Sequence, residues 1–192
     1  MNRKTAMKLF GLLGLLMLLS CGYADRHRNN SSCEQVLVDS LEVRIQDSLF
    51  SNVHYSRSQV LDALTQTQDS QVYYRLLALY GKTFFVSSDY DSILYYNRRV
   101  KEFSRNASQS SESLQSPQWN DVLSDVYNIE GNVWMQLNRP DSAITDYKKA
   151  YEYRLKGKKL HLLPDICINI ADAYLHRSDL AHTASYYRRA LF

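Results

Sequence analysis

Apolar residues recur at every third or fourth position along most of the chain, which is the period of an α-helix that buries one face. The first such stretch begins at about residue 34 and carries an apolar residue at every fourth position: Leu37, Leu41, Ile45 and Leu49. After a polar break at 51–52, a second, shorter helix is marked by Val60, Leu61 and Leu64. We expect these two helices to form a hairpin that caps the helices that follow.

A more specific pattern occupies residues 131–150. It begins with a small residue, Gly131, which is followed three positions later by Trp134 and then by a polar turn around Asn138 and Pro140. The next helix carries alanine and tyrosine at regular spacing: Ala143, Tyr147 and Ala150. Small residues let two helices approach closely, and a large aromatic ring fills the wedge between them. The pattern therefore predicts a tightly packed antiparallel helix pair.

The same order of residue types occurs three times. A later copy contains Ala171, Tyr174, Thr183, Tyr187 and Ala190, and an earlier, weaker copy contains Gly81, Phe84, Ile93, Asn97 and Val100. The interval from first to last position is the same in every copy (150 − 131, 190 − 171, 100 − 81). The step from the first copy to the second (131 − 81) is longer than the step from the second to the third (171 − 131). We place the extra length partly in a Ser- and Gln-rich segment at 104–117, where we expect a longer second helix that frays into a loop before a new helix starts near Pro117. The remaining extra residues lie around 156–163.

This repeat resembles the helix–turn–helix of the tetratricopeptide repeat (TPR) family, whose period of about 34 residues is shorter than either step. The resemblance implies an all-α solenoid of about three repeats over residues 34–192, preceded by the degenerate N-terminal hairpin. One departure is Glu130, where the family usually has leucine. An unrelated helical bundle is the alternative fold. The apolar end of the chain, Ala190 to Phe192, is unlike a polar cap, so we expect the array to continue or to dock on a partner.

In the TPR family the first helix of each repeat lines a concave groove. By resemblance, the groove-facing positions of this chain are Arg75, Lys82, Phe85, Asn128, Asn132, Met135, Gln136, Asp172, Leu175 and His176. Asn132 can bond both the N–H and the C=O of a peptide backbone, and Arg75 and Lys82 can hold a carboxylate. These residues predict a peptide-binding groove. The alternative is an ordinary solvated face.

The first twenty residues have the features of an export signal. Three basic residues precede an apolar run at 9–19, which is too short to cross a bilayer. The run ends in Leu18-Leu19-Ser20-Cys21, which resembles the lipobox of bacterial lipoproteins. The resemblance implies cleavage before Cys21, acylation of that residue, and a flexible tether over 21–33. It also implies a periplasm-facing protein anchored in the cell envelope, with the outer membrane favoured. An ordinary signal peptide with an incidental cysteine is the alternative.

Composition and motifs narrow the function further. The net charge of +3 disappears when the signal is removed, because three of the 23 basic residues lie in it and 20 acidic residues remain. A neutral chain without a basic stripe argues against nucleic-acid binding. The sequence has no phosphate-binding glycine motif, zinc-type His/Cys spacing or catalytic serine motif, so we expect no enzyme activity, no metal and no cofactor. Cys167 falls at a core position, and a disulfide with Cys33 is not favoured.

We therefore interpret the chain as an exported, lipid-anchored TPR protein that acts as a scaffold or adaptor by binding other proteins. Two other functions remain open. The chain resembles the N-terminal part of TPR-containing regulators of Bacteroidetes, in which it would be the periplasmic sensory part of a longer, membrane-bound signalling protein. The third possibility is a glycan-uptake lipoprotein, a group that also uses TPRs but has longer chains.

Overall fold

The computed structural model describes residues 35–36, 38–45, 51–107 and 116–191. These residues form helices and turns and contain no strand, which confirms the all-α prediction for this part of the chain. The predicted signal peptide, Cys21, Cys33 and the tether lie outside the described residues. So do Leu37, Leu49 and residues 108–115 of the predicted loop.

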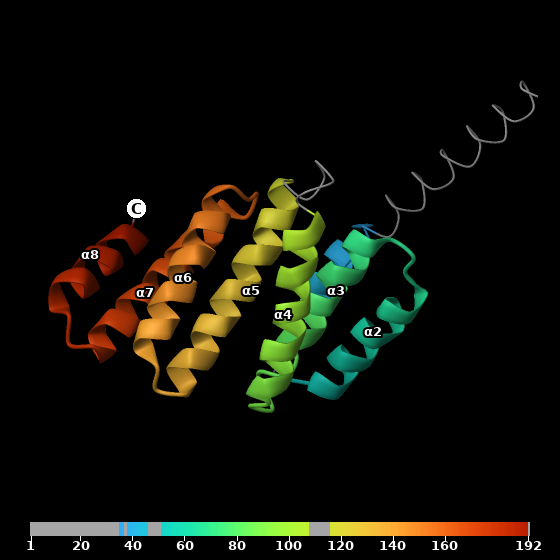
Figure 1. Cartoon of the computed structure of the whole chain (residues 1–192), viewed down its shortest axis with the longest axis horizontal. Helices are drawn as coiled ribbons and strands as arrows, with labels where there is room; N and C mark the ends of the chain where they lie inside the picture. The colour runs from blue at the N-terminus through green and yellow to red at the C-terminus, as the bar shows by residue number, and fades with distance from the viewer. Residues whose placement is uncertain (1–34, 37, 46–50, 108–115, 192) are drawn as a thin grey trace, which may run out of the picture.

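The helices lie side by side in a row and alternate in direction (Figure 1). Residues 35–36 and 38–45 are helical, and we call this segment the N-terminal helix. It is followed by α2 (Val53–Gln66), α3 (Ser70–Lys82), α4 (Tyr90–Ala107), α5 (Pro117–Gln136), α6 (Pro140–Leu155), η2 (Leu160–Leu162), α7 (Leu163–His176) and α8 (Leu180–Ala190). From α2 to α8 each α-helix contacts its neighbours in sequence, and α5 also contacts α3 and α7. The row therefore consists of stacked hairpins, α3–α4, α5–α6 and α7–α8.

The turns of the three hairpins share one backbone conformation. Ser88, Asn138 and Ser178 have left-handed φ angles of 54°, 55° and 59°. They are separated by the same two steps as the sequence copies (138 − 88 and 178 − 138). In the middle turn the N–H of Asn138 donates to the carbonyl of Met135 at 3.0 Å, and the N–H of Arg139 donates to the carbonyl of Trp134 at 2.8 Å. The equivalent pairs of bonds are present in the other two turns. This is the Schellman arrangement, which satisfies carbonyls at a helix end.

Three helix starts show ordinary capping chemistry. Asp89 accepts the backbone N–H of Ser92 at 3.1 Å at the start of α4. Ser116 accepts the backbone N–H of Trp119 at 3.2 Å, and the proline in the first turn of α5 is Pro117. Pro140 likewise lies in the first turn of α6, where its missing N–H would have had no partner. The helix start expected near Pro117 is confirmed.

Gly131 brings α5 and α6 into close contact. A Cβ atom placed on Gly131 would lie 2.3 Å from Cε1 of Tyr147, so no side chain fits there without movement. Ala143 and Ala150 are completely buried on the facing side of α6. The close approach predicted from these small residues is confirmed. At Gly81, the equivalent position of the previous hairpin, the added Cβ would lie 3.1 Å from Cβ of Tyr96, so the packing is looser.

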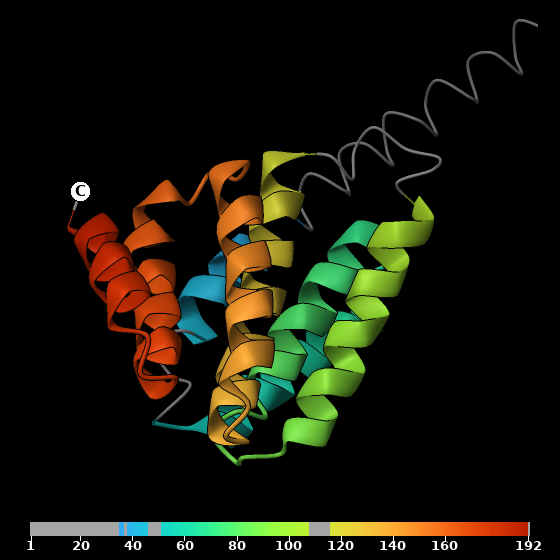
Figure 2. The same ribbon diagram turned by 60° about the vertical axis from the view of Figure 1, so that its left-hand side comes forward.

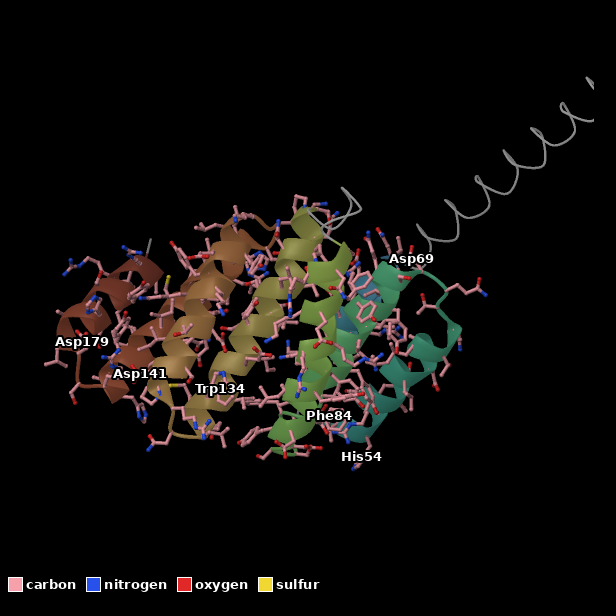
Figure 3. All side chains as sticks on the ribbon, viewed as in Figure 1. His54, Asp69, Phe84, Trp134, Asp141 and Asp179 are labelled. Carbon is pink, nitrogen blue, oxygen red and sulfur yellow. The ribbon has the colours of Figure 1, made fainter. Side chains whose placement is uncertain are left out.

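The aromatic residues of the repeat differ in depth. Phe84 and Trp134 are only partly buried and lie at the same, lower end of successive hairpins (Figure 3). The indole N–H of Trp134 donates to Asp146 Oδ2 at 2.8 Å, which explains how it tolerates partial burial. Trp119, near the start of α5, is 1% exposed and is among the largest fully buried side chains. Cys167 is buried, as predicted.

The N-terminal helix lies differently from a regular end cap. Its residues Val38, Leu41 and Ile45 are buried in one cluster with residues of α2 and α3. Figure 2 shows this helix on the side of the row that α3, α5 and α7 line. It therefore covers part of the surface that the sequence predicts to be a groove. On α2, the prediction for Leu61 is wrong: it is 46% exposed, and Ala63 is buried instead.

Among the residues that the structure describes, no helix has both the length and the apolar character needed to cross a membrane.

Candidate functional site

A pocket of about 280 Å³ opens between α3 and α5. One face of α3 supplies residues at helical spacing: Arg75, Ala78, Leu79 and Lys82. The facing side of α5 supplies Val122, Asp125, Val126, Asn128, Ile129 and Asn132. Glu42 of the N-terminal helix, Asn97 of α4 and Lys159 of the loop before η2 complete the lining. The pocket is thus apolar at its helix–helix contact and carries polar groups around it.

Four of the ten predicted groove residues line this one pocket: Arg75, Lys82, Asn128 and Asn132. They come from two successive hairpins, as a continuous groove requires. The remaining six lie outside it. The ring of Phe85 contacts that of Tyr90, with centroids 6.4 Å apart, and Met135 packs against the core of α6 and α7. Gln136, Leu175 and His176 are exposed near the ends of their helices.

Asn132 is only partly available to a ligand. The hydroxyl of Tyr147 donates to Asn132 Oδ1 at 2.7 Å, and burial raises the pKa of that tyrosine. The amide NH₂ of Asn132 remains for other partners. At the equivalent position of the next hairpin, Asp172 accepts a hydrogen bond from the hydroxyl of Tyr187. The Oδ1 of Asn132 is therefore occupied within the chain, and its NH₂ group is the part that can bind a peptide.

Arg75 is the most constrained cation of the pocket. Its residue exposure is 9%, and its Nη2 lies 2.6 Å from Asp39 Oδ1 and 3.1 Å from Glu42 Oε1, both on the N-terminal helix. Burial opposes the charged form, but the hydrogen bonds and charges of Asp39 and Glu42 outweigh it and raise the pKa of Arg75. Within the described part of the chain, the Nε of Arg75 is buried and has no hydrogen-bond partner. Arg75 thus binds carboxylates of its own chain, those of Asp39 and Glu42.

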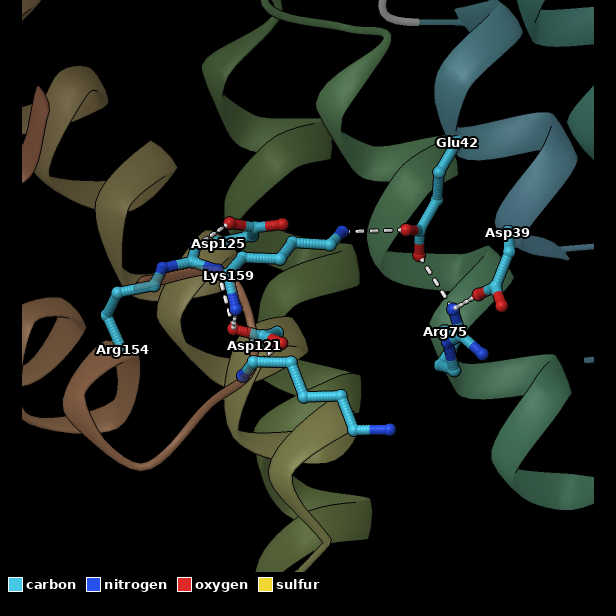
Figure 4. A network of polar contacts seen from close by, with 8 residues as sticks. Asp39, Glu42, Arg75, Asp121, Asp125, Arg154 and Lys159 are labelled. Atoms are coloured by element: carbon cyan, nitrogen blue, oxygen red, sulfur yellow. Dashed lines mark hydrogen bonds and ion pairs between the residues drawn. The ribbon is translucent and has the colours of Figure 1, made fainter. Parts of the chain in front are cut away.

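Glu42 bridges two cations that are distant in sequence. Its Oε2 lies 2.9 Å from Nζ of Lys159, while its other oxygen contacts Arg75 (Figure 4). Burial lowers the pKa of Lys159, but the Glu42 carboxylate, together with Asp125 and Asp121, raises it overall. The N-terminal helix is therefore joined by ion pairs to α3 and to the loop that leads into η2 and α7.

A second ion-pair group holds the loop that carries Lys159. Arg154 is 1% exposed and bonds Asp121 Oδ1 at 2.7 Å, and it also pairs with Asp125. Asp121 in turn accepts the backbone N–H groups of Lys158 at 2.8 Å and Lys159 at 3.2 Å. Because a fully buried arginine requires paired charges, this group fixes the loop and with it the position of Lys159 (Figure 4).

The loop also depends on Gly157. A Cβ atom at this residue would lie 2.1 Å from Asp121 Oδ1, so any side chain would displace the carboxylate that binds the loop. The glycine therefore allows the loop backbone to reach Asp121.

Asn97 forms the floor of the pocket. It is completely buried, and its amide nitrogen donates to the carbonyl of Val126 at 3.1 Å. Its Oδ1 has no hydrogen-bond partner among the residues that the structure describes. Because buried polar atoms are normally paired, this acceptor and the Nε of Arg75 mark a polar departure from ordinary core packing beside the pocket.

Three residues outside the predicted groove set also line the pocket: Glu42, Asn97 and Lys159. Asn97 was visible as the polar residue of the first copy, at the position where the other copies have tyrosine. Asp39 and Glu42 lie three residues apart beside the apolar stripe of the N-terminal helix, and this spacing placed both on one face. Nothing in the local pattern indicated Lys159.

The described residues include no group of three or more His, Cys, Asp or Glu side chains arranged to hold a metal ion. No protein-family model matches the chain, and no curated protein matches it.

Proposed function

We propose that this chain is a TPR-type solenoid that acts as an adaptor by binding a segment of another polypeptide between α3 and α5. The observation that carries the proposal is that four predicted groove residues from two repeats line one pocket. The turn conformation common to the three hairpins, which recurs at the same steps as the sequence copies, supports the TPR-type architecture.

The chemistry of the pocket favours a polypeptide that carries carboxylates. Three cations line the pocket: Arg75, Lys82 and Lys159. Arg75 and Lys159 are paired with acids of the N-terminal helix, and Asp125 is paired with Arg154. Lys82 is then the pocket cation that faces a partner's carboxylate. Amide groups of Asn128 and Asn132 lie along the same wall as the apolar side chains of α5. This combination of an apolar strip with a few charged and amide groups is typical of sites that bind side chains and backbone together.

The binding experiment compares purified variants as baits for envelope proteins. Lys82→Glu reverses a pocket charge, and Lys156→Glu makes the same charge change at an exposed residue outside the pocket. We expect a bound protein to be lost with Lys82→Glu and retained with Lys156→Glu. Equal recovery by both variants would remove this pocket as the binding site.

A second pair of variants tests the amide. Asn132→Ala removes its NH₂ from the pocket and also breaks the bond to Tyr147, whereas Tyr147→Phe breaks that bond alone. We expect Asn132→Ala to reduce recovery of the bound protein more than Tyr147→Phe does. Equal reductions would assign the effect to the lost internal bond.

We further propose that the mature protein is exported and anchored through acylated Cys21. The support is the sequence pattern at 1–21 alone. Mass spectrometry of the protein purified from membranes tests it: we expect an N-terminal peptide that begins at Cys21 and carries acyl chains, which Cys21→Ser abolishes. An unmodified peptide that begins elsewhere would contradict the anchor.

A further inference from the structure

The N-terminal helix has the composition of a ligand for the pocket beside it. Val38, Leu41 and Ile45 form one apolar face, which is buried against α2 and α3. Asp39 and Glu42, on the adjoining face, pair with Arg75 and Lys159. An amphipathic helix that places an apolar stripe in a groove and acids against flanking cations is a recurrent mode of peptide recognition.

The docked helix supplies two of the carboxylates that offset the positive charge of the pocket. Glu42 pairs with both Arg75 and Lys159, and Asp39 gives Arg75 a second carboxylate partner. Lys82 lines the same pocket, and its ammonium group adds to the positive charge there. When the helix leaves, three cations face a pocket whose remaining carboxylate, Asp125, is held by Arg154. The uncovered site is therefore positive and partly apolar.

Part of the contact that holds this helix is open to solvent. A helix of about ten residues is marginal in isolation, so it holds its shape only against the rest of the protein. The side chains of Asp39 and Lys159 are 67% and 39% exposed, whereas those of Arg75 and Glu42 are 9% and 22% exposed. Ion pairs open to solvent hold weakly, so the pair of Glu42 with Arg75 and the apolar face contribute most to docking.

We propose that the N-terminal helix is an internal ligand that closes this site, and that the partner is an acidic amphipathic helix which displaces it. This inference rests on the proposed binding function. It adds the chemical class of the partner and the displacement of the N-terminal helix by that partner, which we call the switch.

The test uses a labelled synthetic peptide with the sequence of residues 35–45 and the full chain after signal removal. Glu42→Lys breaks the bridge to Arg75 and Lys159, and Asp62→Lys makes the same charge change at an exposed position of α2. Fluorescence anisotropy should show at least tenfold tighter binding of the peptide to Glu42→Lys than to the unaltered chain or to Asp62→Lys. A peptide in which both acids are replaced by lysine should not bind.

Hydrogen exchange of the variants without peptide measures how readily the N-terminal helix leaves its site. Amides of 38–45 should exchange at least tenfold faster in Glu42→Lys than in Asp62→Lys, while those of α5 and α6 stay unchanged. If faster exchange throughout shows that Glu42→Lys is misfolded, Glu42→Gln replaces it, because it removes the charge and keeps the shape. Unchanged exchange of 38–45 in the folded variant would overturn the switch.

The outcomes separate this inference from the binding function. If all chains bind the peptide equally and Lys82→Glu alone weakens binding, the site stands and the switch is wrong. If no chain binds the peptide and Lys82→Glu also leaves partner recovery unchanged, both proposals are wrong.

Discussion

The seam between α4 and α5 and the seam between α6 and α7 occupy equivalent places in the array and are built differently. The α6–α7 seam is apolar: Tyr147 and Ile170 are buried in one cluster with alanines and isoleucines of both helices. The equivalent positions of the α4–α5 seam hold Asn97 (147 − 50) and Glu130 (170 − 40). Glu130 is 3% exposed and pairs with Nζ of Lys101 at 2.6 Å.

The same repeat can therefore build either a packed seam or a seam that carries polar groups next to a pocket. Apolar side chains fill most of the α6–α7 seam, where Lys148 of α6 also donates to the hydroxyl of Tyr174 of α7 at 2.9 Å. Polar side chains at the α4–α5 seam require partners, and Asn97 Oδ1 has none within the described part of the chain. The pocket adjoins this polar seam, where packing alone does not satisfy every group. Departures from local packing rules of this kind are expected at functional sites.

Replacing Arg154 should have the largest effect on stability, because Arg154 and Asp121 fix the loop between α6 and η2. Arg154→Met leaves the buried Asp121 without its cation. Breaking one partner of a buried ion pair destabilises a protein by about 3–5 kcal/mol. Urea denaturation should show a loss of that size, with Arg188→Met, an exposed change on α8, as the control. A loss equal to that of the control would show that the loop does not depend on Arg154.

Alanine replacements of Gly131 and Gly81 compare how closely the helices approach in the α5–α6 and α3–α4 hairpins. Gly131→Ala places a Cβ 2.3 Å from the Tyr147 ring, and overpacking of this kind costs about 1–3 kcal/mol. Gly81→Ala meets its nearest atom at 3.1 Å, and the gain in helix propensity, up to about 1 kcal/mol, offsets the crowding. Thermal unfolding should rank Gly131→Ala well below Gly81→Ala. Equal stabilities would contradict the closer packing of α5 on α6.

The shared turn conformation predicts a smaller, stabilising effect. Ser88 and Ser178 have positive φ angles, which glycine adopts without strain. We expect Ser88→Gly and Ser178→Gly each to raise the free energy of unfolding by about 0.5–1 kcal/mol. Asn138→Gly should raise it less, because asparagine tolerates this conformation better than serine does. Chemical denaturation measures all three, and destabilisation by either serine replacement would argue against a common turn.

The polar seam also predicts a pH dependence that the apolar seam lacks. Burial raises the pKa of Glu130 above its ordinary value of 4.5, although Lys101 opposes this shift. The folded state therefore binds a proton more readily than the unfolded state. The contribution of Glu130 to stability is present below pH 4.5 and is lost as the pH rises through the folded pKa.

Glu130→Gln should remove this slope. The stability of the unaltered chain relative to Glu130→Gln should fall as the pH rises from about 4.5 towards neutrality. Denaturation of both proteins at a series of pH values measures the difference. A difference that rises with pH would mean that the Lys101 pair outweighs burial.

The sequence predicted those features that depend on neighbours along the chain. The helix starts at Pro117 and Pro140, the close approach at Gly131 and the all-α character of the described residues follow from local spacing. Its error at Leu61 came from a stretch with only three apolar markers, too few to decide which face is buried. The site depends on contacts that no local pattern records, above all Glu42 with Lys159, 117 residues apart.

We propose that a partner binds between α3 and α5, beside the polar α4–α5 seam, and not at the apolar α6–α7 seam. The most direct measurement is the hydrogen-exchange footprint of the bound 35–45 peptide on the full Glu42→Lys chain. We predict slower exchange in α2 and α3, against which residues 38–45 pack, and in the α5 wall of the pocket that Glu42 lines, with no change in α7 and α8. Protection confined to α7 and α8, or no protection at saturating peptide, would contradict the account.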